Sequence, residues 1–147
     1  MRDFITDRTQ ADVDRCSELL KKGYTNFTED ERTEWIGVAM RGAYNYTDFN
    51  RVESAVKEAA VPFMIDLETK TDWGCFDAPT MSETRRYLSN IAAIRERCPD
   101  SIVFPSLPNN LNNMNYTIAN NIEITMSLAL RYTDSVSRSG DLFCGEV

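Results

Sequence analysis

The sequence predicts an all-α fold: a single-domain bundle of about five helices over residues 1–138, followed by a short extended C-terminal tail over residues 139–147. Apolar residues recur at helical spacing in five segments. Three of these segments open on a threonine followed three residues later by an acidic residue, which is the pattern of a capping box. A strand-like alternation is missing before the C-terminus. With 147 residues, 42% of them hydrophobic, the chain is long enough to bury one core.

Capping boxes predict where the first two helices begin. Thr9 pairs with Asp12 at the start of the first helix, and Thr28 pairs with Glu31 at the start of the second. Gly23 ends the first helix. The expected buried stripes are Val13, Cys16 and Leu20 in the first helix and Trp35, Val38 and Ala39 in the second.

Prolines predict where the next two helices end. The third follows a turn at residues 44–47 and ends at Pro62, and the fourth begins at the box of Thr80 and Glu83 and ends at Pro99. The expected inward faces are Phe49, Val52, Val56 and Ala59 in the third helix and Tyr87, Leu88, Ile91, Ile94 and Cys98 in the fourth.

The last helix is predicted from about Asn115 to about Ser137. Its main stripe is Ile118, Ile122, Met126, Ala129 and Val136. Because Ile124 and Leu128 lie off this stripe, the helix is either central in the bundle or part of a subunit contact, and we favour the central position. Beyond it, two small-Gly-acid-aliphatic units at residues 139–142 and 144–147 predict an extended tail that docks on a surface.

Charge and composition exclude several classes of function. The chain has 16 Lys+Arg against 23 Asp+Glu, a net charge of −7, whereas a nucleic-acid binder needs a positive face. It contains no histidine, which removes Ser-His and Cys-His triads and the common zinc sites. We therefore expect no nucleic-acid partner, no enzyme activity, no metal and no cofactor.

The N-terminus and the cysteines predict an intracellular start. Residues 1–8 are polar and mixed in charge, and no stretch has the apolar length of a membrane span, so we expect synthesis and folding in the cytoplasm. The four cysteines are widely spaced and form no C-x-x-C pair. We expect four reduced thiols, with Cys16 and Cys98 on apolar helical faces.

A polar unit repeats near the start of the third and last helices. Asn50 and Glu53 lie in one, Asn120 and Glu123 lie in the other, and an aromatic residue followed by threonine precedes each pair. Residues three apart are neighbours on a helix surface. We interpret the four residues as a structural polar network, in which each Asn and Glu satisfies backbone groups of the adjoining connector where the helix enters the bundle. The repeat also indicates two helical hairpins of related design, without demonstrating a duplication.

One connector carries a candidate sugar site. Asp72, Trp73 and Asp77 lie close together within residues 61–79. An aromatic ring beside two acids can bind a sugar, and two carboxylates can cleave a glycosidic bond. In so acidic a chain such neighbours also arise by chance, and a tryptophan more often fills the core beneath a loop.

A resemblance rests on segments spread in order along nearly the whole chain. These segments are Ile5-Thr6-Asp7-Arg8-Thr9, residues 42–53 (Gly-Ala-Tyr-Asn-Tyr-Thr-Asp-Phe-Asn-Arg-Val-Glu), Thr71-Asp72-Trp73, Asp77-Ala78-Pro79-Thr80, Arg86-Tyr87-Leu88-Ser89-Asn90, Ala119-Asn120-Asn121-Ile122-Glu123 and the Gly-acid repeat of the tail. Together they resemble virion structural proteins of phages and prophages of Gram-positive bacteria. Asn115 stands where that pattern has a threonine cap, and Cys144 stands where it has a tyrosine.

This resemblance implies a non-enzymatic virion component of the tail, baseplate or fibre region, made in the host cytoplasm before assembly. Its partners would be other virion proteins or further copies of the same chain. Within that picture the expected docking residues are Leu142, Phe143 and Val147, with Asp141 and Glu146 setting the register against basic partners. The alternatives are a carbohydrate- or receptor-binding module and an acidic regulator of a host enzyme, followed by a carboxylate hydrolase.

Overall fold

The computed structural model describes the backbone of residues 3–146 and the side chains of residues 3–138. These residues form five α-helices, one 3-10 turn and no strand. The helices are α1 (Gln10–Lys22), α2 (Glu29–Ile36), α3 (Tyr46–Ala60), α4 (Met81–Arg97) and α5 (Tyr116–Glu146), and the turn η1 spans Tyr24–Asn26. The predicted all-α bundle of about five helices is confirmed.

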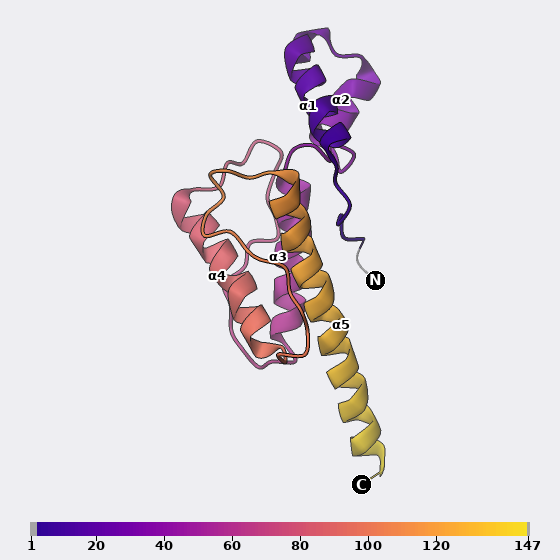
Figure 1. Cartoon of the computed structure of the whole chain (residues 1–147), viewed down its shortest axis with the longest axis vertical. Helices are drawn as coiled ribbons and strands as arrows, with labels where there is room; N and C mark the ends of the chain where they lie inside the picture. Colours follow the sequence, from indigo (N-terminus) through magenta and orange to yellow (C-terminus); the bar gives the residue numbers. More distant parts are fainter. Residues whose placement is uncertain (1–2, 147) are drawn as a thin grey trace.

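The core lies between α3, α4 and α5. Figure 1 shows these three helices side by side and running in the same direction, so the connectors at residues 61–80 and 98–115 must each return along the bundle. The helices are therefore not paired as hairpins. Side chains with less than 2% exposure at the centre of this core are Val52, Val56, Ile91, Ile94, Ile122 and Met126.

Both connectors are extended and help to cover the core. Ile65 and Leu67 pack against it from the first connector, and Ile102 and Phe104 pack against it from the second. Val103, which lies between Ile102 and Phe104, is 88% exposed. In an extended backbone, successive side chains point to opposite sides, so alternate residues face the bundle. The connectors thus run back along the bundle in an extended conformation and cover the core without forming a sheet.

The helices α1 and α2 form a lobe (residues 9–43) at one end of the bundle (Figure 1). It has a small core of its own, made of Cys16, Leu19, Phe27 and Met40. The linker that leaves the lobe passes so close to α1 that a Cβ at Gly42 would lie 2.0 Å from the backbone oxygen of Asp12. Only glycine fits there. Residues 3–8, which we call the N-terminal arm, precede the lobe and lie along the bundle.

The lobe differs from the prediction in two ways. Leu19 is fully buried and Leu20 is 63% exposed, because the small core uses the i, i+3 pair of Cys16 and Leu19 rather than the i, i+4 pair. The second helix ends at Ile36, before the residues expected to continue its stripe. Val38 is accordingly 58% exposed, and Ala39 is exposed as well. The residue that the lobe buries after this helix is Met40, which is 3% exposed.

The end of the chain also differs from the prediction, because α5 continues to Glu146 where an extended tail was expected. The segment from Ser137 to Glu146 contains no proline, and its two glycines do not end the helix. The last part of α5 projects beyond α3 and α4 (Figure 1). Val136, expected on the buried stripe, is 42% exposed, since the bundle ends near Thr133. Among the described residues, no helix has both the length and the apolarity to cross a membrane.

Candidate functional site

The N-terminal arm is held on α5 by Asn120 and Glu123, which we call the α5 clamp. The side-chain amide of Asn120 accepts a hydrogen bond from the backbone N–H of Arg8 at 3.0 Å and donates one to the backbone oxygen of Arg8 at 3.0 Å. Glu123 accepts a hydrogen bond from the backbone N–H of Ile5 at 2.7 Å. Asn120 and Glu123 therefore hold Ile5 and Arg8, which are the first and fourth residues of the extended segment 5–8.

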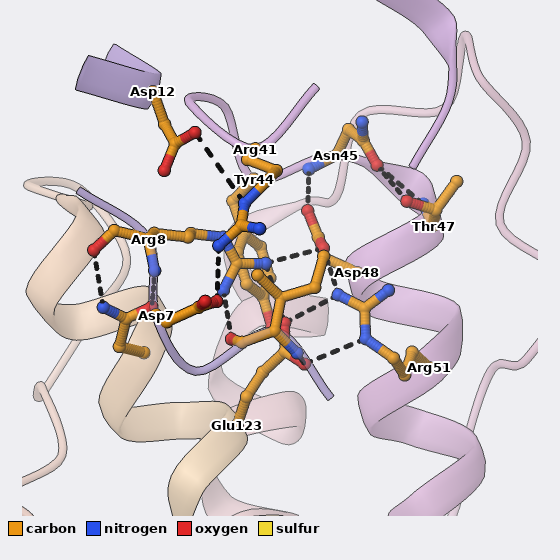
Figure 2. Close-up of polar contacts among 12 residues, drawn as sticks. Asp7, Arg8, Asp12, Arg41, Tyr44, Asn45, Thr47, Asp48, Arg51 and Glu123 are labelled. Atoms are coloured by element: carbon orange, nitrogen blue, oxygen red, sulfur yellow. Dashed lines mark hydrogen bonds and ion pairs between the residues drawn. The ribbon is translucent and has the colours of Figure 1, made fainter. Parts of the chain in front are cut away.

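Behind the clamp lies a quartet of two arginines and two carboxylates, Arg8, Asp48, Arg51 and Glu123 (Figure 2). The Arg8 guanidinium donates to Asp48 at 2.8 Å and to Glu123 at 2.7 Å. Arg51 donates to the two oxygens of Glu123 at 2.9 and 2.6 Å and also contacts Asp48. The side chains of Arg8 and Glu123 are 1% and 0% exposed. The quartet joins the arm, α3 and α5.

The four formal charges of the quartet cancel, which is the condition for burying them. Burial raises the pKa of Asp48, and the neighbouring Arg8 opposes that rise. For Arg51 burial disfavours the charged form, but the hydrogen bonds and charges of Glu123 and Asp48 together outweigh burial, so the pKa of Arg51 is raised. Asp48 also accepts the backbone N–H of Asn45, the N-cap residue of α3, at 2.9 Å. The quartet is thus tied to the start of α3.

A second clamp lies on α3 and consists of Asn50 and Glu53. The amide of Asn50 accepts the backbone N–H of Trp73 at 2.7 Å and donates to the backbone oxygen of Trp73 at 2.9 Å. Glu53 accepts the backbone N–H of Lys70. An arginine again pairs with the glutamate, since Arg86 donates to both oxygens of Glu53 at 3.0 and 2.8 Å. We call Asn50 and Glu53 the α3 clamp.

The four residues expected to form a structural polar network therefore bind backbone groups of two extended segments. The α3 clamp holds the connector that follows its own helix. The α5 clamp holds the distant N-terminal arm rather than the connector that precedes α5. Their neighbour Asn121 contacts that connector instead, through a hydrogen bond to the backbone oxygen of Ser106 at 3.2 Å.

The candidate sugar site is not an open one. Trp73 is 5% exposed and packs against Phe49, with ring centroids 5.5 Å apart. The Lys70 ammonium lies 4.0 Å from the centroid of the indole ring. Asp77 accepts the backbone N–H of Gly74 at 2.7 Å, which closes a local turn, and Asp72 is exposed. A sugar stacks on an exposed ring face, and Trp73 offers none. The ring instead fills the core beneath its connector.

The expected docking residues cannot be placed as side chains. Asp141, Leu142, Phe143 and Glu146 belong to the last turns of α5, but their side chains lie outside the described residues. Val147 lies outside the described backbone as well.

A cavity of about 610 Å³ lies between the lobe and the bundle, and Arg8, Arg41, Tyr44 and Tyr116 are among its lining residues. Arg8 is already paired within the quartet. Arg41 is paired with Asp7 and lies 3.7 Å from Asp12 (Figure 2). The two arginines in the wall are therefore not free to neutralise an anionic ligand, and the cavity defines no chemistry of its own.

A pair of tyrosines, of which Tyr87 is buried, is expected to make the fold sensitive to high pH. The hydroxyls of Tyr44 and Tyr87 lie 2.6 Å apart, and burial raises the pKa of Tyr87 well above its ordinary value. Unfolded tyrosine ionises near pH 10, whereas Tyr87 in the folded chain does not, so this contribution to stability is complete below about pH 10 and is lost as the pH rises further. We expect Tyr87 to ionise only when the chain unfolds, so part of the tyrosinate absorbance should appear at the same pH at which the helical circular dichroism is lost.

The matched variants are Tyr87→Phe and Tyr24→Phe. Tyr24 is 53% exposed, so its substitution should leave the alkaline transition unchanged. Tyr87→Phe should weaken the dependence of stability on pH above about pH 10. Ionisation of every tyrosine before any loss of circular dichroism would contradict the prediction.

Sequence reasoning identified the Asn and Glu residues but missed the charged residues around them, which are Arg8, Asp48, Arg51 and Arg86. One signal was present in the sequence, because Thr-Asp occurs in both bound segments, as Thr6-Asp7 and as Thr71-Asp72. Comparison of the chain with family models, curated proteins and solved structures finds no match.

Proposed function

We propose that this chain is a non-enzymatic structural or adaptor protein of a phage virion, associated with the tail, baseplate or fibre region and acting through protein–protein contacts. Two lines of support stand behind the proposal. The first is the resemblance of the sequence, segment by segment and in order, to phage and prophage virion proteins. The second is the projecting end of α5.

The projection of α5 is the observation that carries the proposal. The helix extends to Glu146, but among the side chains that the structure describes its last buried residue is Thr133, and residues 134–138 are all exposed. The exposed turn at residues 134–138 gains little stability by itself, because helices in proteins are stabilised chiefly by packing. Contact with a neighbouring subunit would supply that packing. Leu142 and Phe143 lie on this segment of the sequence and are the residues we assign to the contact.

Deletion of residues 139–147 tests this assignment. We expect the shortened chain to keep its helical circular dichroism and cooperative unfolding, since the core ends before the deletion. We expect its incorporation into particles to be lost. The measurement is mass spectrometry of purified particles from a phage that carries the altered gene.

A double substitution, Leu142→Ala with Phe143→Ala, should reproduce the loss without shortening the helix. Ser139→Ala is the matched control and should assemble normally. Normal assembly of the deletion variant would overturn the docking role. Absence of the unaltered protein from purified particles, together with salt-sensitive capture of one host protein, would overturn the virion assignment in favour of a regulator.

A further inference from the structure

The two clamps belong to similar stretches of sequence, identical at five of nine positions. Residues 45–53 read Asn-Tyr-Thr-Asp-Phe-Asn-Arg-Val-Glu, and residues 115–123 read Asn-Tyr-Thr-Ile-Ala-Asn-Asn-Ile-Glu. The shared residues are the N-terminal Asn-Tyr-Thr, the clamp Asn and the clamp Glu, with an aliphatic residue before each Glu. Asn45 accepts the backbone N–H of Thr47 at 2.9 Å, and Asn115 accepts that of Ile118 at 2.9 Å. An asparagine at the equivalent position thus caps each helix.

The segments that the clamps bind also match. The arm contains Ile5-Thr6-Asp7-Arg8, and the connector contains Lys70-Thr71-Asp72-Trp73. In each, the first residue donates its backbone N–H to the clamp Glu, and the fourth exchanges two hydrogen bonds with the clamp Asn. The contacts agree in donor, acceptor and position.

The helices α3 and α5 also have equivalent positions in the bundle. They run in the same direction (Figure 1), with Arg51 of α3 bound to Glu123 of α5 near their first turns. Near the end of α3, the ring of Phe63 stacks on Tyr132, with centroids 6.1 Å apart. Equivalent positions of the two stretches therefore lie at the same level of the bundle.

We propose that the chain contains two copies of one unit, an extended Thr-Asp segment followed later in the sequence by a clamp helix, and that each clamp is a peptide-binding site for the other copy's segment. The arm and α3 form the first unit, and residues 70–73 and α5 form the second. The helix α3 binds the segment of the second unit, and α5 binds the segment of the first. The exchange is reciprocal and joins the two units into one domain.

The chemistry of the site defines its ligand. Both clamps bind main-chain N–H and C=O groups at the first and fourth residues, so the ligand is an extended peptide of four residues. The arginine at the fourth position adds selectivity at the α5 clamp, where it completes the buried quartet. A separate peptide with the sequence of residues 3–9 should therefore occupy the α5 clamp when the chain's own arm is weakened.

The test uses the full chain carrying Arg8→Ala. The probe is the peptide of residues 3–9, and we expect it to raise the Tm of this variant by several degrees at saturation, because only the folded state has the site. The peptide of residues 68–74, which has the connector sequence, should raise the Tm by a smaller amount. The control peptide of residues 3–9 with alanine in place of arginine should have a much smaller effect than its parent.

Two further variants locate the binding. Adding Asn120→Asp to Arg8→Ala should abolish the response, since a carboxylate cannot donate to the Arg8 backbone oxygen. Adding the matched Asn50→Asp should leave the response intact. No response to the arm peptide, or an equal response in the Asn120→Asp chain, would overturn the proposal.

Hydrogen exchange on the unaltered chain gives a second test that needs no variant. The backbone N–H groups of Ile5, Arg8, Lys70 and Trp73 all donate to a clamp, whereas those of the intervening Thr-Asp pairs do not. We expect protection at the first and fourth residues of both segments and fast exchange at the second and third. A different pattern in the two segments would contradict their equivalence.

Discussion

Replacing Glu123 by alanine should destabilise the chain by about 3–5 kcal/mol, which is the usual cost of breaking a buried ion pair by removing one partner. Glu123 is fully buried and accepts hydrogen bonds from Arg8, Arg51 and the Ile5 backbone. Its loss leaves the buried Arg8 and the partly buried Arg51 facing Asp48 alone. The expected fall in Tm is roughly 6–20 °C, measured by thermal unfolding.

Two variants make this result specific. Glu96 lies on the exposed side of α4, so Glu96→Ala should change the stability by less than about 0.5 kcal/mol. Glu123→Gln keeps the shape of the side chain but removes the charge, and it should lie between the alanine variant and the unaltered chain. If Glu123→Ala unfolded like Glu96→Ala, the quartet would contribute nothing to stability.

Replacing Trp73 by alanine should cost about 3–5 kcal/mol, which is typical of removing a buried aromatic side chain from a core. The ring is 5% exposed and packs against Phe49 and the Lys70 ammonium. Its indole N–H has no hydrogen-bond partner. Because that N–H is buried at a cost of its own, Trp73→Phe should be much milder than Trp73→Ala. Chemical denaturation of the three chains measures both differences.

Phe76 is the matched control, since it lies in the same connector and is 96% exposed. We expect Phe76→Ala to change stability by less than about 0.5 kcal/mol. Equal losses for Trp73→Ala and Phe76→Ala would mean that the connector does not fill the core as described.

Helix starts were predictable because a capping box is local. Thr9, Thr28 and Thr80 are all N-cap residues in the structure, each with the expected acid three positions on. The inward face of α4 was predictable for the same reason, since one helix supplies both the spacing and the terminating proline. The end of α2 and the buried face of α1 depend on what each helix packs against. Local spacing carries no information about that.

In the site as well, local features could be predicted from the sequence and contacts between distant residues could not. The Asn and Glu of each clamp lie three apart on one helix, so their pairing is visible in the sequence. Their ligands are not, because 112 residues separate Arg8 from Asn120 and 23 separate Asn50 from Trp73. Nothing in the local sequence of Arg8 distinguishes it from an exposed surface arginine. Its burial depends on two acids supplied by different helices.

The pairing of the arm with α5 determines the order in which the contacts of the chain can form during its synthesis on the ribosome. Arg8 precedes Glu123 by 115 residues. At a synthesis rate of about 5–20 residues per second, Arg8 is added to the chain roughly 6–23 s before its glutamate partner. A nascent chain can complete the α3 clamp long before the α5 clamp, so the quartet forms last. Chains released early by a nonsense codon before residue 123 would carry an unbound arm and be open to cellular proteases.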